Sequence, residues 1–272
     1  MASFSEYDSF AYAVTGTARS GSPREWIVGP AMAKVFQTTC TGLGGGNSCV
    51  PSIPFFQAVL DNGLQRGWDG LTVHPYDVSE IPASPDVFVT GGYLNNLRQM
   101  VSAAGSAVPI LVGEWGYKLP WHGGSDETPY QPAYAIRMWL SDVAAGVPLT
   151  VWYHWEDGGD GPYGLLDGSG SPRQSYWALR FAAERLLNAT FVAKVSTNPS
   201  TTQYNFQISG KNVYVAYTDT PGSMVLAVVP GSYQIDSLNL ATNPPTIVSS
   251  SILSTGTITV NLNQTPVILS QH

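Results

Sequence analysis

The stretch "VPILVGEWGYKLPW" at residues 108–121 decides how the first part of the chain is built. Its first five residues are apolar or Pro, as in a strand that is buried on both faces of a parallel sheet. Gly113, Glu114 and Trp115 follow directly. A carboxylate beside such a run is costly unless it is paired or has a chemical role. The stretch therefore predicts a buried strand that presents Glu114 at its C-terminal end.

Strand-like and helix-like segments alternate up to about residue 190. We expect strands at 25–32, 68–77, 108–117 and 147–158, and helices at 3–21, 53–65, 90–105, 129–146 and 171–188. Strands that alternate with helices imply right-handed crossovers and a parallel sheet. Glu6 stands near the start of the first helix, where a carboxylate is favourable beside the helix dipole.

The character of the chain changes after about residue 190. Short segments rich in Val, Ile, Thr and Tyr, separated by Pro, Gly and Asn, are expected as strands at 202–208, 212–219, 224–231, 242–248, 256–262 and 265–271. This pattern favours a small antiparallel β-sandwich. The predicted domains are therefore a region with a parallel sheet at 1–189 and a β-sandwich at 190–272.

The composition excludes several classes of protein. With 43% hydrophobic residues in 272, the chain is globular rather than disordered. The net charge of −7, without a Lys/Arg cluster, argues against nucleic acid as a partner. No apolar run reaches the length that spans a membrane, so no membrane contact is expected. The N-terminus lacks the features of a signal peptide, so either the signal was removed or the chain is an internal piece.

Two cysteines, Cys40 and Cys49, bracket the flexible segment "TGLGGGNS". A loop of that length can close into a disulfide, which would suit a secreted or extracytoplasmic protein; the alternative is two free thiols. The charged content of only 11% also fits a secreted protein. Two Cys without nearby His are too few ligands for a metal site.

Polar and aromatic side chains follow the C-terminal ends of three successive strands. They are His74 and Tyr76, then Glu114 and Trp115, then Trp152, His154, Trp155, Glu156 and Asp157. In a parallel β/α architecture these strand ends share one rim, where active sites are built. Each residue has a simpler explanation: Glu114 could cap a helix, His74 could be a satisfied core histidine, and Trp155 could be packing. Their convergence is the stronger signal.

A carboxylate among aromatic rings suits glycoside hydrolysis, because the carboxylate can attack the anomeric carbon while the rings stack on the sugar. A Tyr and a His nearby can hold that carboxylate ionised and correctly oriented. No cofactor is needed for this chemistry.

Several segments, in order and spacing, resemble clan A glycoside hydrolases, the retaining (β/α)8-barrel enzymes, and families 5 and 39 most. "WIVGPA" resembles their fifth strand, "GLTVHPYD" the sixth and "ILVGEWGY" the seventh, while "TVWYHWEDGGDGPYGLLDGSGSPRQSYWALRFAAERL" resembles the eighth strand with its loop and helix. The resemblance covers about residues 5–270. It implies that Glu114 is the nucleophile, that a Trp of the last loop lines the subsite of the cleaved sugar, and that a β-sandwich follows the barrel.

The chain departs from that family at one point. The family's general acid/base is the Glu of an Asn-Glu-Pro motif that ends the fourth strand, and this sequence contains no Asn-Glu-Pro. The resemblance thus starts after the fourth strand. It implies that residues 1–189 are a catalytic region of barrel type, a half barrel of strands five to eight. A retaining mechanism needs a second carboxyl about 5–5.5 Å from the first. Glu156 or Asp157 could supply it, because neighbouring strands lie about 4.8 Å apart; the alternative is that both shape the last loop.

The leading hypothesis is a glycosidase that acts on β-linked oligo- or polysaccharide with Glu114 as nucleophile. One alternative is a carbohydrate-binding remnant that keeps an aromatic rim of Trp68, Tyr76, Trp115, Trp121, Trp152 and Trp155. Another is a truncated product without activity of its own. A half barrel would leave two strand edges exposed, and also an inner face with Ile27, Thr72, Val112 and Val151 or their alternating neighbours. We therefore expect a homo-oligomer.

Overall fold

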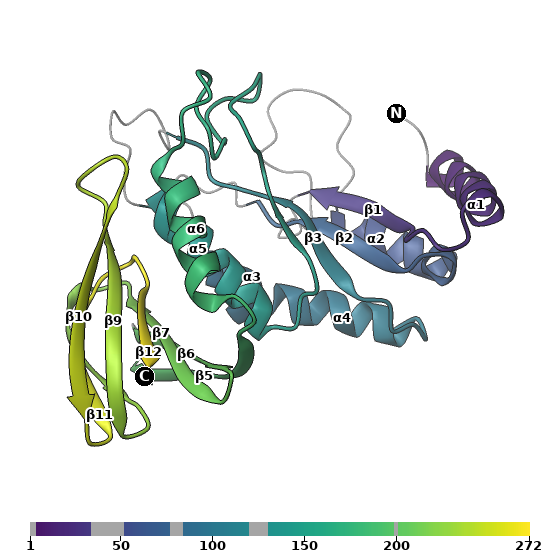
Figure 1. The fold of residues 1–272 in the computed structure, drawn as a ribbon. Coiled ribbons are helices and arrows are strands. Elements are labelled where there is room, and N and C mark those ends of the chain that lie inside the picture. The colour runs from purple at the N-terminus through teal and green to yellow at the C-terminus, as the bar shows by residue number, and fades with distance from the viewer. Residues whose placement is uncertain (1–3, 34–51, 77–83, 120–129, 199–200) are drawn as a thin grey trace. The chain divides into compact units, whose positions relative to one another are not determined.

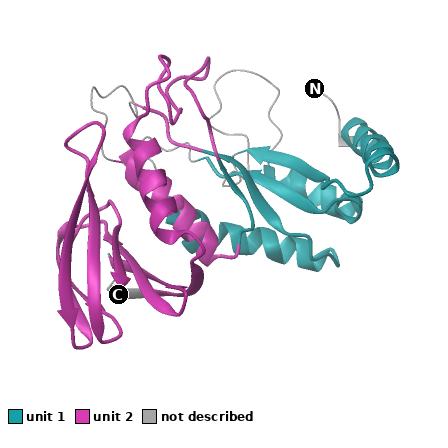
Figure 2. Cartoon of the chain, viewed as in Figure 1, with its two compact units in different colours: residues 1–115, 147–151 teal, residues 116–146, 152–272 magenta. Residues whose placement is uncertain are grey.

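The computed structural model describes residues 4–33, 52–76, 84–119, 130–198 and 201–272 (Figure 1). These residues form two compact units, which Figure 2 colours separately. Unit 1 comprises residues 1–115 and 147–151, and unit 2 comprises residues 116–146 and 152–272. Cys40, Cys49 and Trp121 lie outside the described residues, so the predicted disulfide and the predicted sugar contact of Trp121 stay predictions.

A four-stranded sheet in the order β1-β2-β3-β4 organises unit 1 (Figure 1). Its strands are β1 (Val28–Ala33), β2 (Gly70–His74), β3 (Ile110–Trp115) and β4 (Thr150–Trp152). β2 pairs in parallel with both β1 and β3, as the alternation of strands and helices predicts. Val73 and Val112 are paired in register and fully buried, which explains why these strands read as continuous apolar runs.

Helices connect the strands of unit 1. They are α1 (Phe4–Gly21), α2 (Ser52–Asp61), α3 (Asp86–Thr90) and α4 (Tyr93–Ala103), with a 3-10 turn η1 (Leu64–Gly67). The expected helix over 53–65 is interrupted because Gly63 takes a left-handed conformation with φ of 73°, which glycine adopts without steric cost. Helix α3 was not expected from the sequence. None of the described helices is long and apolar enough to cross a membrane.

Polar contacts anchor α1 to the strand that follows η1. Arg19 Nη2 donates to Asp69 Oδ2 at 2.6 Å, and Trp68 Nε1 donates to Thr15 Oγ1 at 3.0 Å. Trp68 is therefore a buried core residue that packs under α1 rather than a member of an aromatic rim. Glu6 lies in the first turn of α1, as expected for a carboxylate near the helix dipole.

Unit 2 contains a six-stranded sheet in the order β10-β9-β12-β7-β6-β5 and a two-stranded sheet of β11 and β8. The strands are β5 (Thr190–Asn198), β6 (Thr201–Ile208), β7 (Lys211–Thr218), β8 (Gly222–Ala227), β9 (Gly231–Asn239), β10 (Thr246–Ser254), β11 (Thr257–Leu262) and β12 (Val267–Gln271). All the strand pairs described here are antiparallel, as the segments after residue 190 predict. The sequence analysis missed two of these strands, β5 and β9.

The large sheet of unit 2 is covered on both faces. On one face, Tyr214 and Tyr233 share a buried cluster with Leu226 of β8 and Ile258 of β11. Val215 follows Tyr214 along β7 and therefore points to the opposite face. That face packs against the two helices α5 (Tyr130–Ala144) and α6 (Gln174–Leu186). Unit 2 therefore contains residues from both sides of position 189, because α5 and α6 pack on the C-terminal sheet.

Candidate active site

Glu114 lies at the C-terminal end of β3, and the end of the neighbouring strand β2 brings two side chains to it. Tyr76 Oη donates a hydrogen bond to Glu114 Oε1 at 2.9 Å. His74 Nδ1 lies 3.6 Å from Glu114 Oε2, an ion-pair distance longer than a hydrogen bond. All three residues belong to unit 1. The structure therefore brings together the predicted carboxylate, phenol and imidazole at the shared end of two parallel strands.

The glycine before Glu114 makes room for this arrangement. A Cβ atom added at Gly113 would lie 3.3 Å from Thr72 Cγ2 and 3.5 Å from His74 Nε2. The side chain of any larger residue would extend further toward the imidazole. Gly113, the residue before Glu114, thus leaves space for the His74 imidazole of the neighbouring strand β2.

Burial and charge set the state of the two ionisable partners. The Glu114 side chain is 33% exposed, so a substrate can reach it, while the His74 side chain is only 17% exposed. Burial lowers the pKa of His74, and the carboxylate of Glu114 opposes that shift without cancelling it. His74 is therefore neutral at pH 7. Of the two groups beside Glu114, the Tyr76 hydroxyl lies closer to the carboxylate than the His74 imidazole does.

Trp115 points away from this group. Its side chain is 3% exposed and packs edge-on against Phe88 of α3, with ring centroids 5.8 Å apart. Consecutive residues of a strand face opposite sides of a sheet, so Glu114 and Trp115 cannot both face the same side. This burial favours a packing role; the predicted contact of Trp115 with sugar stays a prediction.

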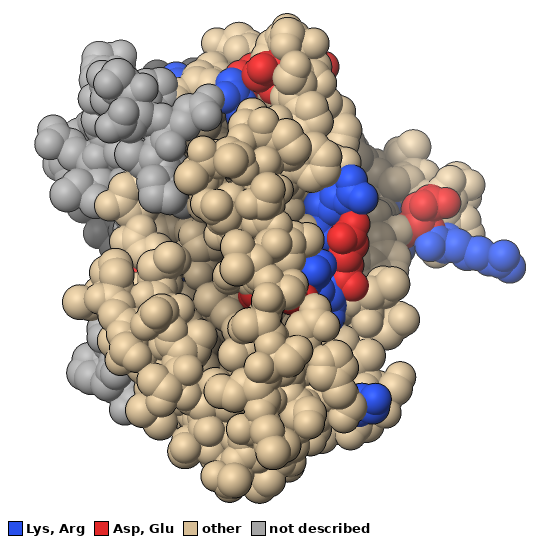
Figure 3. Space-filling view, turned by 60° about the vertical axis from the view of Figure 1, so that its left-hand side comes forward, with Lys and Arg blue, Asp and Glu red and all other residues tan. Residues whose placement is uncertain are grey.

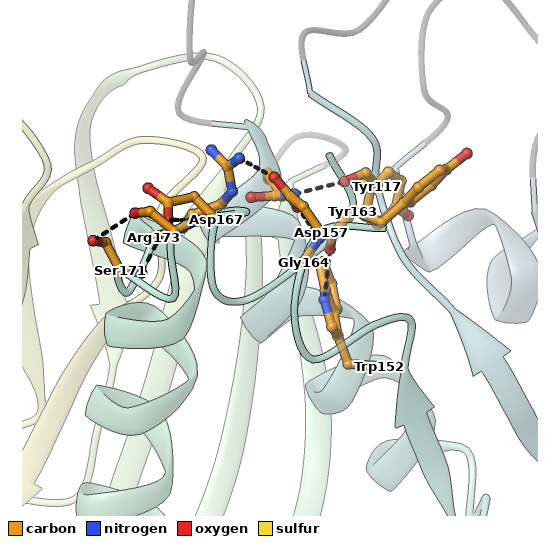
Figure 4. Close-up of polar contacts among 10 residues, drawn as sticks. Tyr117, Trp152, Asp157, Tyr163, Gly164, Asp167, Ser171 and Arg173 are labelled. Atoms are coloured by element: carbon orange, nitrogen blue, oxygen red, sulfur yellow. Dashed lines mark hydrogen bonds and ion pairs between the residues drawn. The ribbon is translucent and has the colours of Figure 1, made fainter. Parts of the chain in front are cut away.

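The segment that follows β4 holds its shape through a carboxylate. Asp157 Oδ1 accepts a hydrogen bond from the Gly164 backbone N–H at 2.8 Å, and Asp157 Oδ2 accepts one from Arg173 Nη2 (Figure 4). The Asp157 and Arg173 side chains are 15% and 16% exposed. Asp157 therefore joins three separate points of this segment, which is the loop-shaping alternative that the sequence left open.

Two further contacts complete the loop. Trp152 Nε1 donates to the Tyr163 carbonyl at 3.1 Å (Figure 4). Asp167 Oδ1 accepts from the backbone N–H groups of Ser169 and Ser171, each at 2.9 Å. The hydroxyl of Ser169 and these N–H groups lower the pKa of Asp167, so the turn is held by an ionised carboxylate. The bond from Nε1 fixes one edge of the Trp152 indole, whose ring centroid lies 6.3 Å from that of Tyr117.

The remaining predicted residues of this segment differ in exposure. Trp155 is 60% exposed, and Glu156 is also exposed. The rings of Tyr153, His154 and Tyr163 form a cluster, in which the His154 centroid lies 4.5 Å from that of Tyr153 and 6.4 Å from that of Tyr163. Within the described part of the chain, no group hydrogen-bonds to the buried His154 Nε2 atom. These residues belong to unit 2, and their predicted contacts with substrate stay predictions.

The sequence reading missed the partners that hold this segment. Arg173 and Tyr163 were not singled out, although Arg173 stands directly before α6 and is the sole basic residue between positions 119 and 180 apart from Arg137. A lone arginine beside a run of carboxylates was the available signal.

The fold is similar to those of solved glycoside hydrolases. A family 39 glycoside hydrolase from the gut symbiont Bacteroides cellulosilyticus WH2 is 23% identical, with a TM-score of 0.62 over 80% of this chain and 47% of that one. The α-L-arabinofuranosidase of Thermotoga maritima is 13% identical, with a TM-score of 0.70 over 100% of this chain and 62% of that one. A GH30 endoxylanase from Clostridium papyrosolvens C71 is 13% identical, with a TM-score of 0.63 over 99% of this chain and 60% of that one.

These similarities confirm the predicted resemblance to clan A glycoside hydrolases at the level of the fold. The chain spans between 47% and 62% of the length of the three structures. No family model matches the sequence, and no curated protein is similar to it.

Proposed function

We propose that this protein is a glycosidase that hydrolyses β-linked oligo- or polysaccharide with retention of configuration, and that Glu114 is its nucleophile. The observation that carries the proposal is the hydrogen bond from Tyr76 to Glu114 at the C-terminal ends of two parallel strands. Active sites of parallel β/α architectures are built at these ends. The similarity of the fold to glycoside hydrolases supports the same reaction class.

Each residue of this group has a role in the proposed reaction. The carboxylate of Glu114 attacks the anomeric carbon and forms a glycosyl ester, which water then hydrolyses. Tyr76 donates to the oxygen that does not attack and so fixes the orientation of the carboxylate. Neutral His74 fills the other side and adds no positive charge that would weaken the nucleophile. Glu156 is the proposed proton donor for the leaving group, because it is an exposed carboxylate in the segment that resembles the loop after the eighth strand.

The finer architecture belongs to the proposal as well. We infer a half barrel whose strands β1 to β4 correspond to the fifth to eighth strands of a (β/α)8 barrel, followed by a small β-sandwich. β1 and β4 end the sheet order, and Val28, Leu149 and Val151 beside these edges are each between 42% and 50% exposed. Exposed apolar strand edges pair with other chains. This supports a homo-oligomer, and a secreted or extracytoplasmic location fits a polysaccharide substrate.

A second candidate function is carbohydrate binding without turnover. The exposed indole of Trp155 favours it, because an aromatic face binds a sugar ring whether or not a general acid is present. The missing Asn-Glu-Pro motif also fits this alternative. Turnover of a simple glycoside separates the two functions.

The test is hydrolysis of 4-nitrophenyl β-glucoside, β-xyloside and β-galactoside, and of 4-nitrophenyl α-L-arabinofuranoside, by the protein and its Glu114→Gln variant. Glutamine keeps the shape and removes the charge of the nucleophile, so activity should fall by at least about a thousandfold. The control is Glu25→Gln, which changes an exposed carboxylate elsewhere in unit 1 and should leave the rate unchanged.

The covalent step has its own test. A 2-deoxy-2-fluoro glycoside of the preferred sugar slows hydrolysis of the glycosyl ester, so mass spectrometry of a digest should find the sugar on the peptide that contains Glu114. Activity of Glu114→Gln within tenfold of the unchanged protein, or a label on another peptide, would contradict the assignment. Absence of turnover with every glycoside would favour carbohydrate binding alone.

A further inference from the structure

We propose a second carbohydrate-binding site on unit 2, in a pocket between helix α6 and the segment that joins β9 to β10. The pocket has a volume of about 260 Å³. One wall is formed by Trp177, Arg180 and Glu184 of α6, and the other by residues that include Pro244 and Pro245. For its ligand class this inference rests on the proposed function, but the pocket contains none of the residues assigned to the reaction.

Both walls are fixed to each other. At one end, Gln174 Nε2 donates to the Leu240 carbonyl at 2.7 Å. At the other, Arg185 Nε donates to Asp236 Oδ2 at 2.7 Å. These bonds join α6 to β9 and to the turn beyond it, so the pocket is formed before any ligand arrives. A preformed site avoids the entropy cost of ordering its walls on binding.

The chemistry of the α6 wall suits a sugar ring. The Trp177 indole is partly exposed, and the Arg180 guanidinium lies over its ring at 5.5 Å from the centroid. The part of the ring that Arg180 leaves open is a surface on which the C–H face of a sugar can pack. One turn further, Arg180 Nε donates to Glu184 Oε1 at 2.7 Å, and the two side chains are 53% and 49% exposed. This pair presents further N–H donors and carboxylate lone pairs side by side. Adjacent hydroxyls of a sugar can accept from the first and donate to the second.

The same pair argues for a neutral ligand. Arg180 and Glu184 neutralise each other, so an anion would meet the carboxylate and a cation would meet the guanidinium. On the face drawn in Figure 3, charged side chains of both signs lie next to one another among uncharged residues. The volume is just below the ~300–1,000 Å³ of sites for drug-sized ligands, which suits one sugar ring with part of the next.

An aromatic row connects the pocket to the loop after β4. The ring centroids of Trp155 and Tyr176 are 6.3 Å apart, and those of Tyr176 and Trp177 are 5.1 Å apart. The row starts at the exposed Trp155 and ends at the pocket wall. A ligand that follows the whole row is longer than one sugar ring. We therefore infer that the site takes a neutral polysaccharide chain rather than a free monosaccharide.

The test is affinity electrophoresis of the full chain in native gels that contain xylan, arabinan or mixed-linkage β-glucan, supported by calorimetry with oligosaccharides of the polymer that retards it. Trp177→Ala should weaken binding at least about tenfold, because it removes the stacking surface. Arg180→Ala and Glu184→Gln change exposed side chains that the fold does not need, and each should weaken binding severalfold. Trp26→Ala replaces an exposed indole of unit 1 and is the matched control, with unchanged binding.

The outcomes separate this inference from the proposed function. All three pocket variants should turn over a 4-nitrophenyl glycoside at the normal rate, and Glu114→Gln should still bind the polymer. Turnover without any retardation, or equal retardation of the Trp177→Ala variant and the unchanged protein, would overturn the second site and leave the glycosidase intact. Binding that depends on Trp177 without any turnover would overturn the glycosidase and leave the second site intact. A dimer that Arg180→Ala converts to a monomer, with no change in retardation, would show that the pocket is an interface between copies and overturn the inference.

Discussion

Asp157 and Glu156 are neighbouring carboxylates for which the structure indicates different roles. Asp157 bonds to the Gly164 N–H and to Arg173, and its side chain is 15% exposed. Glu156 is exposed, and no hydrogen bond or ion pair of its side chain is found among the described residues. We predict that Asp157→Asn destabilises unit 2, while Glu156→Gln leaves its stability unchanged.

The magnitude follows from the burial of the pair. Removing one partner of a fully buried ion pair costs about 3–5 kcal/mol, whereas an exposed pair contributes about 0–1 kcal/mol. Side chains that are 15% and 16% exposed lie nearer the buried limit. Asparagine keeps an oxygen for the Gly164 N–H but leaves Arg173 without its carboxylate. We therefore expect Asp157→Asn to lower the free energy of unfolding by about 2–3 kcal/mol, which corresponds to a Tm lower by about 4–12 °C.

The assay is thermal unfolding followed by circular dichroism, together with limited proteolysis of the segment 153–173. Asp157→Asn should show the lower Tm and faster cleavage within that segment, because its crosslink is lost. Glu156→Gln is the matched control, since it removes the same charge one residue away. A Tm for Asp157→Asn within 1 °C of that of Glu156→Gln, together with a raised KM for a glycoside, would refute the stabilising role of Asp157. It would indicate instead that Asp157 contacts the substrate.

Three other results are expected. Tyr76→Phe removes a hydrogen bond to a charged oxygen of Glu114, which is worth about 1.5–3 kcal/mol. The kcat/KM for a 4-nitrophenyl glycoside should therefore fall about 10- to 150-fold with an unchanged Tm. An unchanged kcat/KM would show that Tyr76 has no role in the reaction. Burial lowers the pKa of His74 in the folded state, so as the pH falls the imidazole is protonated at a higher pH in the unfolded chain than in the folded one. The free energy of unfolding should therefore decline as the pH falls below about 6.5. That decline should be shallower in His74→Asn, as measured by urea unfolding between pH 5 and 7, and equal slopes would contradict it. Burial raises the pKa of Asp236, but hydrogen bonds from Ser249, Gln234 and Arg185 outweigh burial and leave the pKa lowered. The carboxylate therefore stabilises the folded state above pH 3.8, and this stabilisation is lost as the pH falls through the folded pKa. Asp236→Asn should therefore lower the free energy of unfolding at pH 7 by about 2–4 kcal/mol and have a smaller effect at pH 2 in urea titrations. Equal effects at both pH values would count against this account.

The sequence determined the strands of unit 1 and the place of Glu114. The apolar run at residues 108–112 predicts a strand that is buried on both faces, because consecutive residues of a strand point to opposite faces and here all of them are apolar or Pro. In the same way, the segment "LTV" at residues 71–73 predicted a strand that ends near His74 and Tyr76. Except for β5 and β9, the antiparallel strands after residue 190 followed from β-branched runs between Pro, Gly and Asn.

Strand alternation could also have assigned Trp115. Glu114 and Trp115 are consecutive, so one must face away from the carboxylate's side of the sheet, and the structure shows the indole packed on Phe88. The sequence reading grouped both residues as one site because it considered only where the strand ends.

Only the tertiary structure decided which side chains meet across long separations. The contact of Asp157 with Arg173 and the packing of α5 and α6 on the C-terminal sheet join residues that no local pattern relates. An ion pair depends on two positions and their distance in space, whereas a strand depends on the residues of one short segment. The pocket beside Trp177 has the same origin, since its two walls are far apart in the sequence and become neighbours only when α6 packs against β9.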